Sequence, residues 1–224
     1  MFKKTLYISL LVSIFSCTPE PKKDFSLVTN DFVKEYAPLF PDETPLSIDN
    51  LQLSNLHIPS DSVLNSVQLF YQKFSTEIKG YNTTEIPAAQ QADFNKMQKI
   101  LKNIDSYLTN CPSNPTYFNV LHGFQRILNA DYAPADQRLQ TLFDKLVQVP
   151  AFYEAAKSRL KTADVNKAHE TLEKHFQTYD FFDETLPNYL KKEHHLTPQY
   201  EAHLEAAKLA VKDYVAFVES LRLH

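Results

Sequence analysis

The stretch DQRLQTLFDKLVQVPAFYEAAKSRL, residues 136–160, contains two apolar stripes that meet at a proline. The first stripe recurs every three or four residues, as one face of a helix does, through Leu139, Leu142, Phe143 and Leu146. Pro150 interrupts the pattern, which then resumes with Phe152, Tyr153, Ala156 and Leu160. We expect two helices joined at a proline step, because proline is accepted at the start of a helix and not in its interior. Both stripes need apolar neighbours to cover them.

Similar stripes occur on both sides of this stretch. We predict further helices over residues 25–40, 61–80, 87–111, 114–130, 164–190 and 198–221. Residues 41–60 carry three prolines and little periodicity, which predicts an irregular segment packed on the helices. Since helix pairs are joined by short connections, the sequence predicts an all-α, single-domain antiparallel helical bundle of about seven helices, with an irregular N-terminal segment.

The predicted helix over residues 164–190 is the longest in the middle of the chain. Asp164 is a suitable capping residue at its start, and Pro187 is expected to kink it or end it. Its apolar pattern predicts that the following side chains point into the core: Val165, Ala168, Leu172, Phe176, Tyr179, Phe182 and Leu186.

The composition argues against two classes of function. The chain has 23 Lys and Arg against 27 Asp and Glu, a formal charge of −4, and no basic cluster. Nucleic acids require a basic face, so we predict no nucleic-acid partner. The chain contains only two glycines, which argues against phosphate-cradling loops and against tight-turn β architectures.

Residues 1–16, MFKKTLYISLLVSIFS, have the layout of a bacterial signal peptide. Two lysines precede an apolar run that is too short to span a bilayer. Cys17 follows a small residue, as in a lipoprotein lipobox, and we predict it to be the lipidated N-terminus of the mature chain, with palmitate among its acyl groups. A plain signal peptide or a short N-terminal anchor are the alternatives.

This prediction divides the chain into a signal peptide at 1–16, a lipidated cysteine and polar tether at 17–24, and a helical domain at 25–224. The protein is then held at the cell envelope by its lipid anchor. Asp after the lipidated cysteine is linked to inner-membrane retention, and this chain has Thr18 there. We therefore predict the outer membrane over the inner one.

Two groups of side chains have some likeness to a metal site. His169 and Glu173 lie four residues apart on one helix face, but the zincin pattern needs a second histidine at the fifth position. The second group is His194 and His195, which diverge because they are adjacent, with His203 later in the chain; His195 and His203 would approach only if the turn between them folds back. We interpret the first group as a solvated helix face and the second as a polar corner, and we predict no metal site and no cofactor.

No catalytic constellation is evident elsewhere. Cys111, at a predicted helix end, has no base or oxyanion donor at a recognisable spacing, which predicts an inert, buried or partly buried thiol. We name no catalytic residue.

The central step is similar to a known family. LVQVPAF at 146–152, followed by AAK at 155–157 and Leu160, resembles the N-terminal half of the bacterial domain-of-unknown-function family numbered 885. Lys145 stands where that family commonly has arginine, and NPTY at 114–117 is similar to its Asn/Asp-Pro-x-x-Tyr segment. Full-length members look like metallopeptidases, with a His-Glu-x-x-Pro-Gly-His motif in their C-terminal half. No such motif occurs in this sequence, so the resemblance implies a helical scaffold half without its chemistry.

Two functions remain open on this basis. The first is a non-catalytic binding or assembly module that engages an envelope protein, a peptide or a small ligand through an apolar groove or a surface patch. The second is an enzyme part, either a degenerate relative of the metallopeptidases or a subunit that completes a partner's active site. We expect the first.

Overall fold

The computed structural model describes residues 23–43 and 51–221, and all regular structure in these ranges is helical. The α-helices are α1 (Phe25–Leu39), α2 (Asp61–Lys79), α3 (Gln91–Asn110), α4 (Leu121–Asn129), α5 (Ala135–Val147), α6 (Val149–Arg159), α7 (Val165–Asp180), α8 (Leu186–Lys192) and α9 (Pro198–Leu221). Short 3-10 helices and a π-helical turn connect them: η1 (Pro41–Glu43), η2 (Leu51–Ser54), η3 (Thr83–Glu85), η4 (Ala88–Gln90), η5 (Pro115–Tyr117) and the π turn η6 (Phe181–Thr185). The all-α, single-domain prediction is confirmed. The signal peptide and Cys17 lie outside the described residues.

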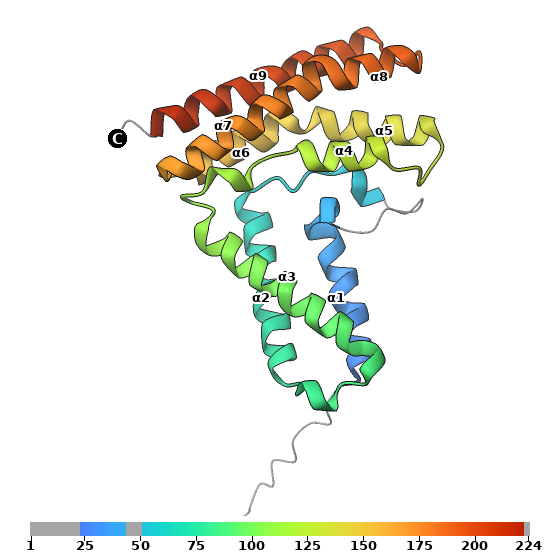
Figure 1. The fold of residues 1–224 in the computed structure, drawn as a ribbon, viewed down its shortest axis with the longest axis vertical. Coiled ribbons are helices and arrows are strands. Elements are labelled where there is room, and N and C mark those ends of the chain that lie inside the picture. Colours follow the sequence, from blue (N-terminus) through green and yellow to red (C-terminus); the bar gives the residue numbers. More distant parts are fainter. Residues whose placement is uncertain (1–22, 44–50, 222–224) are drawn as a thin grey trace, which may run out of the picture.

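The helices lie in two groups. Helices α4 to α9 form one layer, and α1 to α3 form a three-helix group beneath it (Figure 1). What we call the small core is the set Phe25, Val28, Phe32, Val67, Phe70, Phe74, Ile78, Ile86, Phe94, Met97, Leu101 and Ile104. The large core is built by α4 to α9 together with Leu56, Cys111, Phe118 and Val120. Tyr107 packs against both, so the two cores meet beside α3. Across the described ranges, no helix combines the length and the apolar character needed to cross a bilayer.

The proline step predicted in residues 136–160 is present. Pro150 occupies the second position of α6, where the missing N–H has no intrahelical partner to lose. Gln148, between α5 and α6, donates from Nε2 to the carbonyl of Ser54 at 2.7 Å and accepts from the backbone N–H of Leu56 at 3.1 Å. The step therefore anchors the irregular segment that precedes α2.

The face of α7 that meets the core differs from the predicted one. Val165 and Phe176 are 58% and 64% exposed, whereas Thr171, His175 and Thr178 are buried. The two buried hydroxyls donate to carbonyl oxygens one helical turn earlier, at 2.7 and 3.0 Å. A polar side chain can occupy a core position when its polar atoms are bonded, so apolar character alone misplaces this face.

His175 shows how such a residue is accommodated. Its ring nitrogens lie 2.8 Å from the carbonyl oxygen of Thr171 and 2.9 Å from that of Phe118. The rings of Tyr153 and Tyr214 flank it, with centroids 5.6 and 5.0 Å away. Burial lowers the pKa of His175 to about 4, so the ring is neutral near pH 7 and donates to one of the two carbonyls.

Two predicted helices are divided in the structure. The stretch 114–130 forms η5 and then α4, because Asn119 Oδ1 accepts from the backbone N–H of Leu121 at 2.8 Å and starts a new helix there. The stretch 164–190 forms α7, the π turn η6 and α8. The π turn buries the consecutive residues Phe181 and Phe182 and places Pro187 in the first turn of α8, so the helical path continues to Lys192.

Candidate functional site

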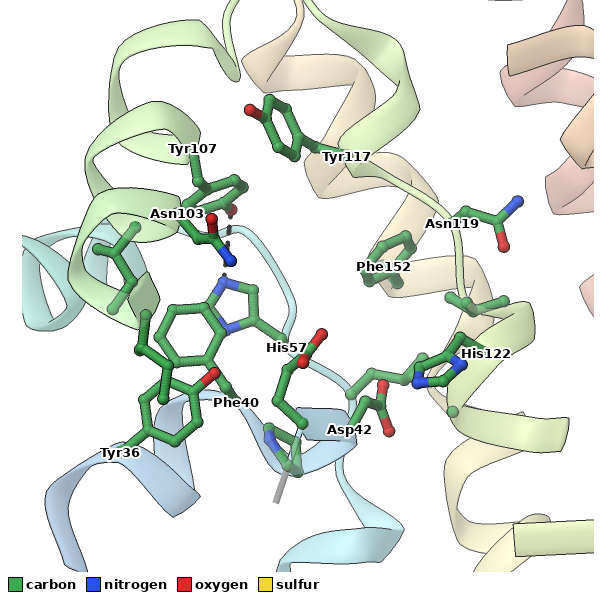
Figure 2. A pocket seen from close by; sticks show the side chains of 17 residues that line it. Tyr36, Phe40, Asp42, His57, Asn103, Tyr107, Tyr117, Asn119, His122 and Phe152 are labelled. Carbon is green, nitrogen blue, oxygen red and sulfur yellow. Dashed lines mark hydrogen bonds between the residues drawn. The ribbon is translucent and has the colours of Figure 1, made fainter. Parts of the chain in front are cut away.

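A pocket of about 310 Å³ lies where the two cores meet (Figure 2). Its walls come from the end of α1, η1, the segment before α2, α3, the start of α4 and α6. Aromatic side chains dominate the lining: Tyr36, Phe40, His57, Tyr107, Tyr117 and Phe152. The volume is at the lower end of the range for small-molecule sites.

The aromatic rings form a continuous wall. Phe40 stacks on His57 with ring centroids 5.0 Å apart and planes 13° apart, and it also stacks on Tyr36 at 4.9 Å. Tyr107 meets His57 edge-on at 5.8 Å and Tyr117 edge-on at 5.4 Å. Mutual ring contacts of this kind hold each side chain in one orientation, so this wall of the pocket is preformed.

His57 is fixed in the pocket wall through both ring nitrogens. Its Nδ1 lies 2.5 Å from the carbonyl oxygen of Leu39, a contact that requires the proton on Nδ1. Its Nε2 lies 3.4 Å from the Tyr107 hydroxyl, drawn as a dashed line in Figure 2. Desolvation lowers the pKa of His57, so near pH 7 the ring is neutral and Nε2 carries a lone pair.

Asp42 joins the two cores at the other end of the pocket. Its Oδ1 lies 2.7 Å from Nζ of Lys145, which is fully buried on α5. The ammonium group also donates to the carbonyl oxygens of Leu53 at 3.2 Å and Asn55 at 2.6 Å. Arg126 of α4 donates to the backbone carbonyl of Asp42. Burial lowers the pKa of Lys145 and the Asp42 carboxylate opposes this shift, so the pair holds the end of α1 against α4 and α5.

Gly123 makes the approach of Asp42 possible. A Cβ on Gly123 would lie 2.4 Å from Asp42 Oδ1, well inside contact distance. The carboxylate therefore rests against the first turn of α4 at a place that only glycine leaves open. Gly123 also lines the pocket, so this contact helps to set the shape of the pocket wall.

The polar rim of the pocket is acidic or neutral. Among the described lining residues the charged side chains are Asp42 and Glu43, and no lysine or arginine is present. Asn103 and His122 add further polar groups and are exposed. Asn119 is already engaged, since its Nδ2 donates to the Thr178 hydroxyl at 2.9 Å.

The metal-site candidates from the sequence do not come together as one site within the described residues. His169 and Glu173 lie 3.4 Å apart with side chains 70% and 69% exposed, while the nearby His175 points into the core. The ring of His203 packs edge-on against the ring of Phe143, with the two centroids 5.2 Å apart. In residues 23–43 and 51–221, no group of three or more His, Cys, Asp or Glu is placed to hold a metal ion.

The remaining candidates, His194, His195 and Cys111, lie in a turn and at a helix end. His194 has a left-handed backbone, with a φ of 58°, in the turn after α8, and His195 contacts Asp136 at 3.2 Å. Cys111 is buried at the end of α3, and burial raises the pKa of its thiol. Such a thiol is largely protonated at neutral pH, which agrees with the predicted inert cysteine.

The pocket was not predictable from the sequence, because its residues come from distant parts of the chain. Two signals were present nonetheless. Lys145 sits inside an apolar stripe, next to Leu146 and three residues after Leu142, at a spacing that points to the core. Gly123 is one of only two glycines in the chain and falls within a helical stripe. A lysine at a core position indicates a buried ion pair, and a glycine within a helix indicates that another part of the chain packs closely against its backbone.

Comparison with known proteins adds a fold relative. No model of a protein family matches the sequence, and no curated protein matches it. Among solved structures, the chain is similar to that of "a putative lipoprotein of unknown function from Shewanella oneidensis", with a TM-score of 0.73 and 17% sequence identity. The two chains share a fold. The match covers 88% of this chain and 37% of that one. The resemblance to the family numbered 885 stays a prediction.

Proposed function

We propose that this protein is a lipid-anchored component of the bacterial cell envelope that binds a small amphipathic organic molecule in the pocket between its two cores. The observation that carries the proposal is the pocket itself, whose volume of about 310 Å³ is enclosed by stacked rings and edged by polar groups. An apolar concavity with a few fixed polar groups is the usual form of a small-molecule site.

Binding is favoured over catalysis by the way the reactive side chains are engaged. The Nδ1 of His57 is bonded to a backbone carbonyl, and the Asp42 carboxylate is paired with Lys145. A general base or a nucleophile needs a partner arranged for proton transfer. The contacts of His57 with Leu39 and of Asp42 with Lys145 instead hold the pocket walls in place.

The lipid anchor rests on the sequence. Residues 1–16 have a signal-peptide layout that ends at Cys17, and Thr18 favours the outer membrane. The solved structure that shares this fold is itself described as a putative lipoprotein, which supports the proposal. Labelled palmitate should enter the wild-type protein in growing cells and not a Cys17→Ser variant. Equal labelling of both would refute the anchor at Cys17, and density-gradient separation of membranes would assign it to one of them.

The binding proposal can be tested at the pocket wall. Ile100 and Ile104 line the pocket, so their isotopically labelled methyl groups report occupancy directly by NMR. We expect the methyl resonances to shift on titration with 3-phenylpropanol or its charged analogues. Asn103→Phe should abolish the shifts, because Asn103 is exposed at the pocket and a ring there would fill it.

Asn95→Phe is the matched control. Asn95 is exposed on the same helix and lies outside the pocket, so this variant should bind like the wild type. Shifts that persist in Asn103→Phe would contradict binding in the pocket. A protein that binds none of the probes and instead co-purifies from membranes with a stoichiometric partner would favour an assembly role or a subunit of a larger enzyme.

A further inference from the structure

The pocket carries a charge pattern that selects among small molecules. Its described lining contains two carboxylates, Asp42 and Glu43, and no lysine or arginine. The nearest cations lie behind Asp42, on the side of the large core. Lys145 is fully buried there and is held by Asp42 and two carbonyl oxygens. Arg126 donates to the Asp42 backbone and is absent from the lining. These two cations therefore compensate Asp42 and do not reach the cavity.

Glu43 is the second carboxylate of the pocket lining. It is exposed, and within the described residues no ion pair involves it. Glu43 lies beside the aromatic wall: its backbone N–H donates to the carbonyl oxygen of Phe40 at 3.0 Å, and Glu43, Tyr36 and Phe40 line the same pocket. Burial, and after it the charge of Glu43, raises the pKa of the Tyr36 hydroxyl.

The neutral groups of the pocket also suit a cation. Both ring nitrogens of the neutral His57 are engaged, Nδ1 by the Leu39 carbonyl and Nε2 by the Tyr107 hydroxyl, so this ring offers no N–H to an anion. Aromatic side chains dominate the lining, and the π electrons of aromatic rings attract a cation within about 6 Å. An anionic head group would meet two carboxylates and no lysine or arginine in the described lining. Tyr36, Phe40 and His57 lie together on one side of the cavity in Figure 2.

We propose that the ligand is an organic amine in its cationic form, with its ammonium group at Glu43 and its apolar body along the ring wall of Tyr36, Phe40 and His57. This inference rests on the proposed function, because it names the chemical class of the molecule that the pocket binds. The carboxylate supplies the charge preference and the rings supply most of the contact area.

A matched set of probes tests the charge preference. The probes 3-phenylpropylamine, 3-phenylpropanol and 3-phenylpropanoate share one body and differ in the charge of the head group. They would be titrated into the chain from residue 17 onward, carrying Cys17→Ser, with dissociation constants read from the Ile100 and Ile104 methyl shifts. We expect the amine to bind about fivefold more tightly than the alcohol at low salt, the size of an exposed ion pair, and the acid to bind most weakly.

The preference should depend on Glu43 and on salt. Glu43→Gln should bring the affinity for the amine close to that for the alcohol and leave the alcohol unchanged. Glu219→Gln, an exposed change in the last turn of α9, is the control and should leave all three affinities unchanged. Added salt should weaken the amine preference, because exposed charges are screened.

The outcomes separate the two proposals. Equal binding of the three probes, or tightest binding of the acid, would overturn the amine assignment while the pocket remains a binding site. An amine preference that survives in Glu43→Gln would likewise overturn it. If none of the three probes shifts the methyl resonances, the proposed binding function fails and the amine assignment fails with it.

Discussion

Replacing Asp42 by asparagine removes the carboxylate that neutralises Lys145. The ammonium group has three contacts, 2.7 Å to Asp42 and 2.6 and 3.2 Å to two carbonyl oxygens, and the Asp42→Asn variant leaves it only neutral acceptors. Removing one partner of a buried pair costs about 3–5 kcal/mol. The Asp42 side chain is 25% exposed, so we expect a loss near the lower end, about 3 kcal/mol.

A double-mutant cycle separates the pair from its surroundings. Lys145→Met fills the same volume and leaves Asp42 in contact with water, so it should cost less, about 1–2 kcal/mol. Once Lys145 is replaced, removing the Asp42 charge should change the free energy of unfolding very little, because no buried ammonium group remains to be neutralised. We therefore expect the double variant to be about 2–3 kcal/mol more stable than the sum of the single changes implies.

Urea unfolding gives the required free energies. The chain has no tryptophan, so far-ultraviolet circular dichroism of its helices is the suitable signal. With an m-value of about 2–3 kcal/mol per molar urea, Asp42→Asn should lower the midpoint by about 1 M. Asp183→Asn is the matched control, because Asp183 contacts Lys208 at 2.8 Å in a pair with a 41% exposed carboxylate. That change should cost less than about 1 kcal/mol. An Asp42→Asn variant as stable as this control, or a cycle that adds without coupling, would refute the assigned role of the pair.

Three further predictions concern single positions. Gly123→Ala should lower the free energy of unfolding by about 2–3 kcal/mol, because its Cβ would lie 2.4 Å from Asp42 Oδ1, whereas Gly80→Ala should change it by less than about 1 kcal/mol in the same urea assay, since its nearest contact is at 3.2 Å. Stability should fall by about 3 kcal/mol as the pH drops from about 6.5 to about 4, because the unfolded chain binds a proton on His175 before the folded chain does, and a His175→Gln variant should show a shallower pH dependence. Cys111 should react slowly with iodoacetamide in the folded protein and rapidly in urea, as followed by peptide mass spectrometry; similar rates in both would contradict its burial.

The helices were predictable from the sequence because their main signal is local. An apolar stripe with a spacing of three or four residues identifies a helix wherever its partner lies, and the step at Pro150 followed from proline chemistry alone. The buried face of α7 was not predictable in this way. His175 is in the core because a carbonyl of Phe118 lies 2.9 Å from its ring, and that carbonyl belongs to a distant segment.

The pocket was beyond sequence reasoning for a related physical reason. The contacts that define this site join residues far apart in the sequence. Asp42 pairs with Lys145, and His57 bonds to the carbonyl of Leu39. Spacing rules describe residues on one element, whereas this site forms where several elements converge. The lysine in an apolar stripe indicated that a partner must exist, and only the fold showed which carboxylate it is.

The position of α1 has a mechanical consequence. The predicted tether, residues 17–24, precedes the first residue of this helix in the sequence, while the pocket is lined by Tyr36 and Phe40 at its end. A helix of 15 residues is about 22 Å long. In a chain attached to lipid through Cys17, α1 would act as a rigid spacer between the attachment point and the binding cavity. The cavity would then open to water above the head groups, where it can sample dissolved molecules, instead of lying against the bilayer surface.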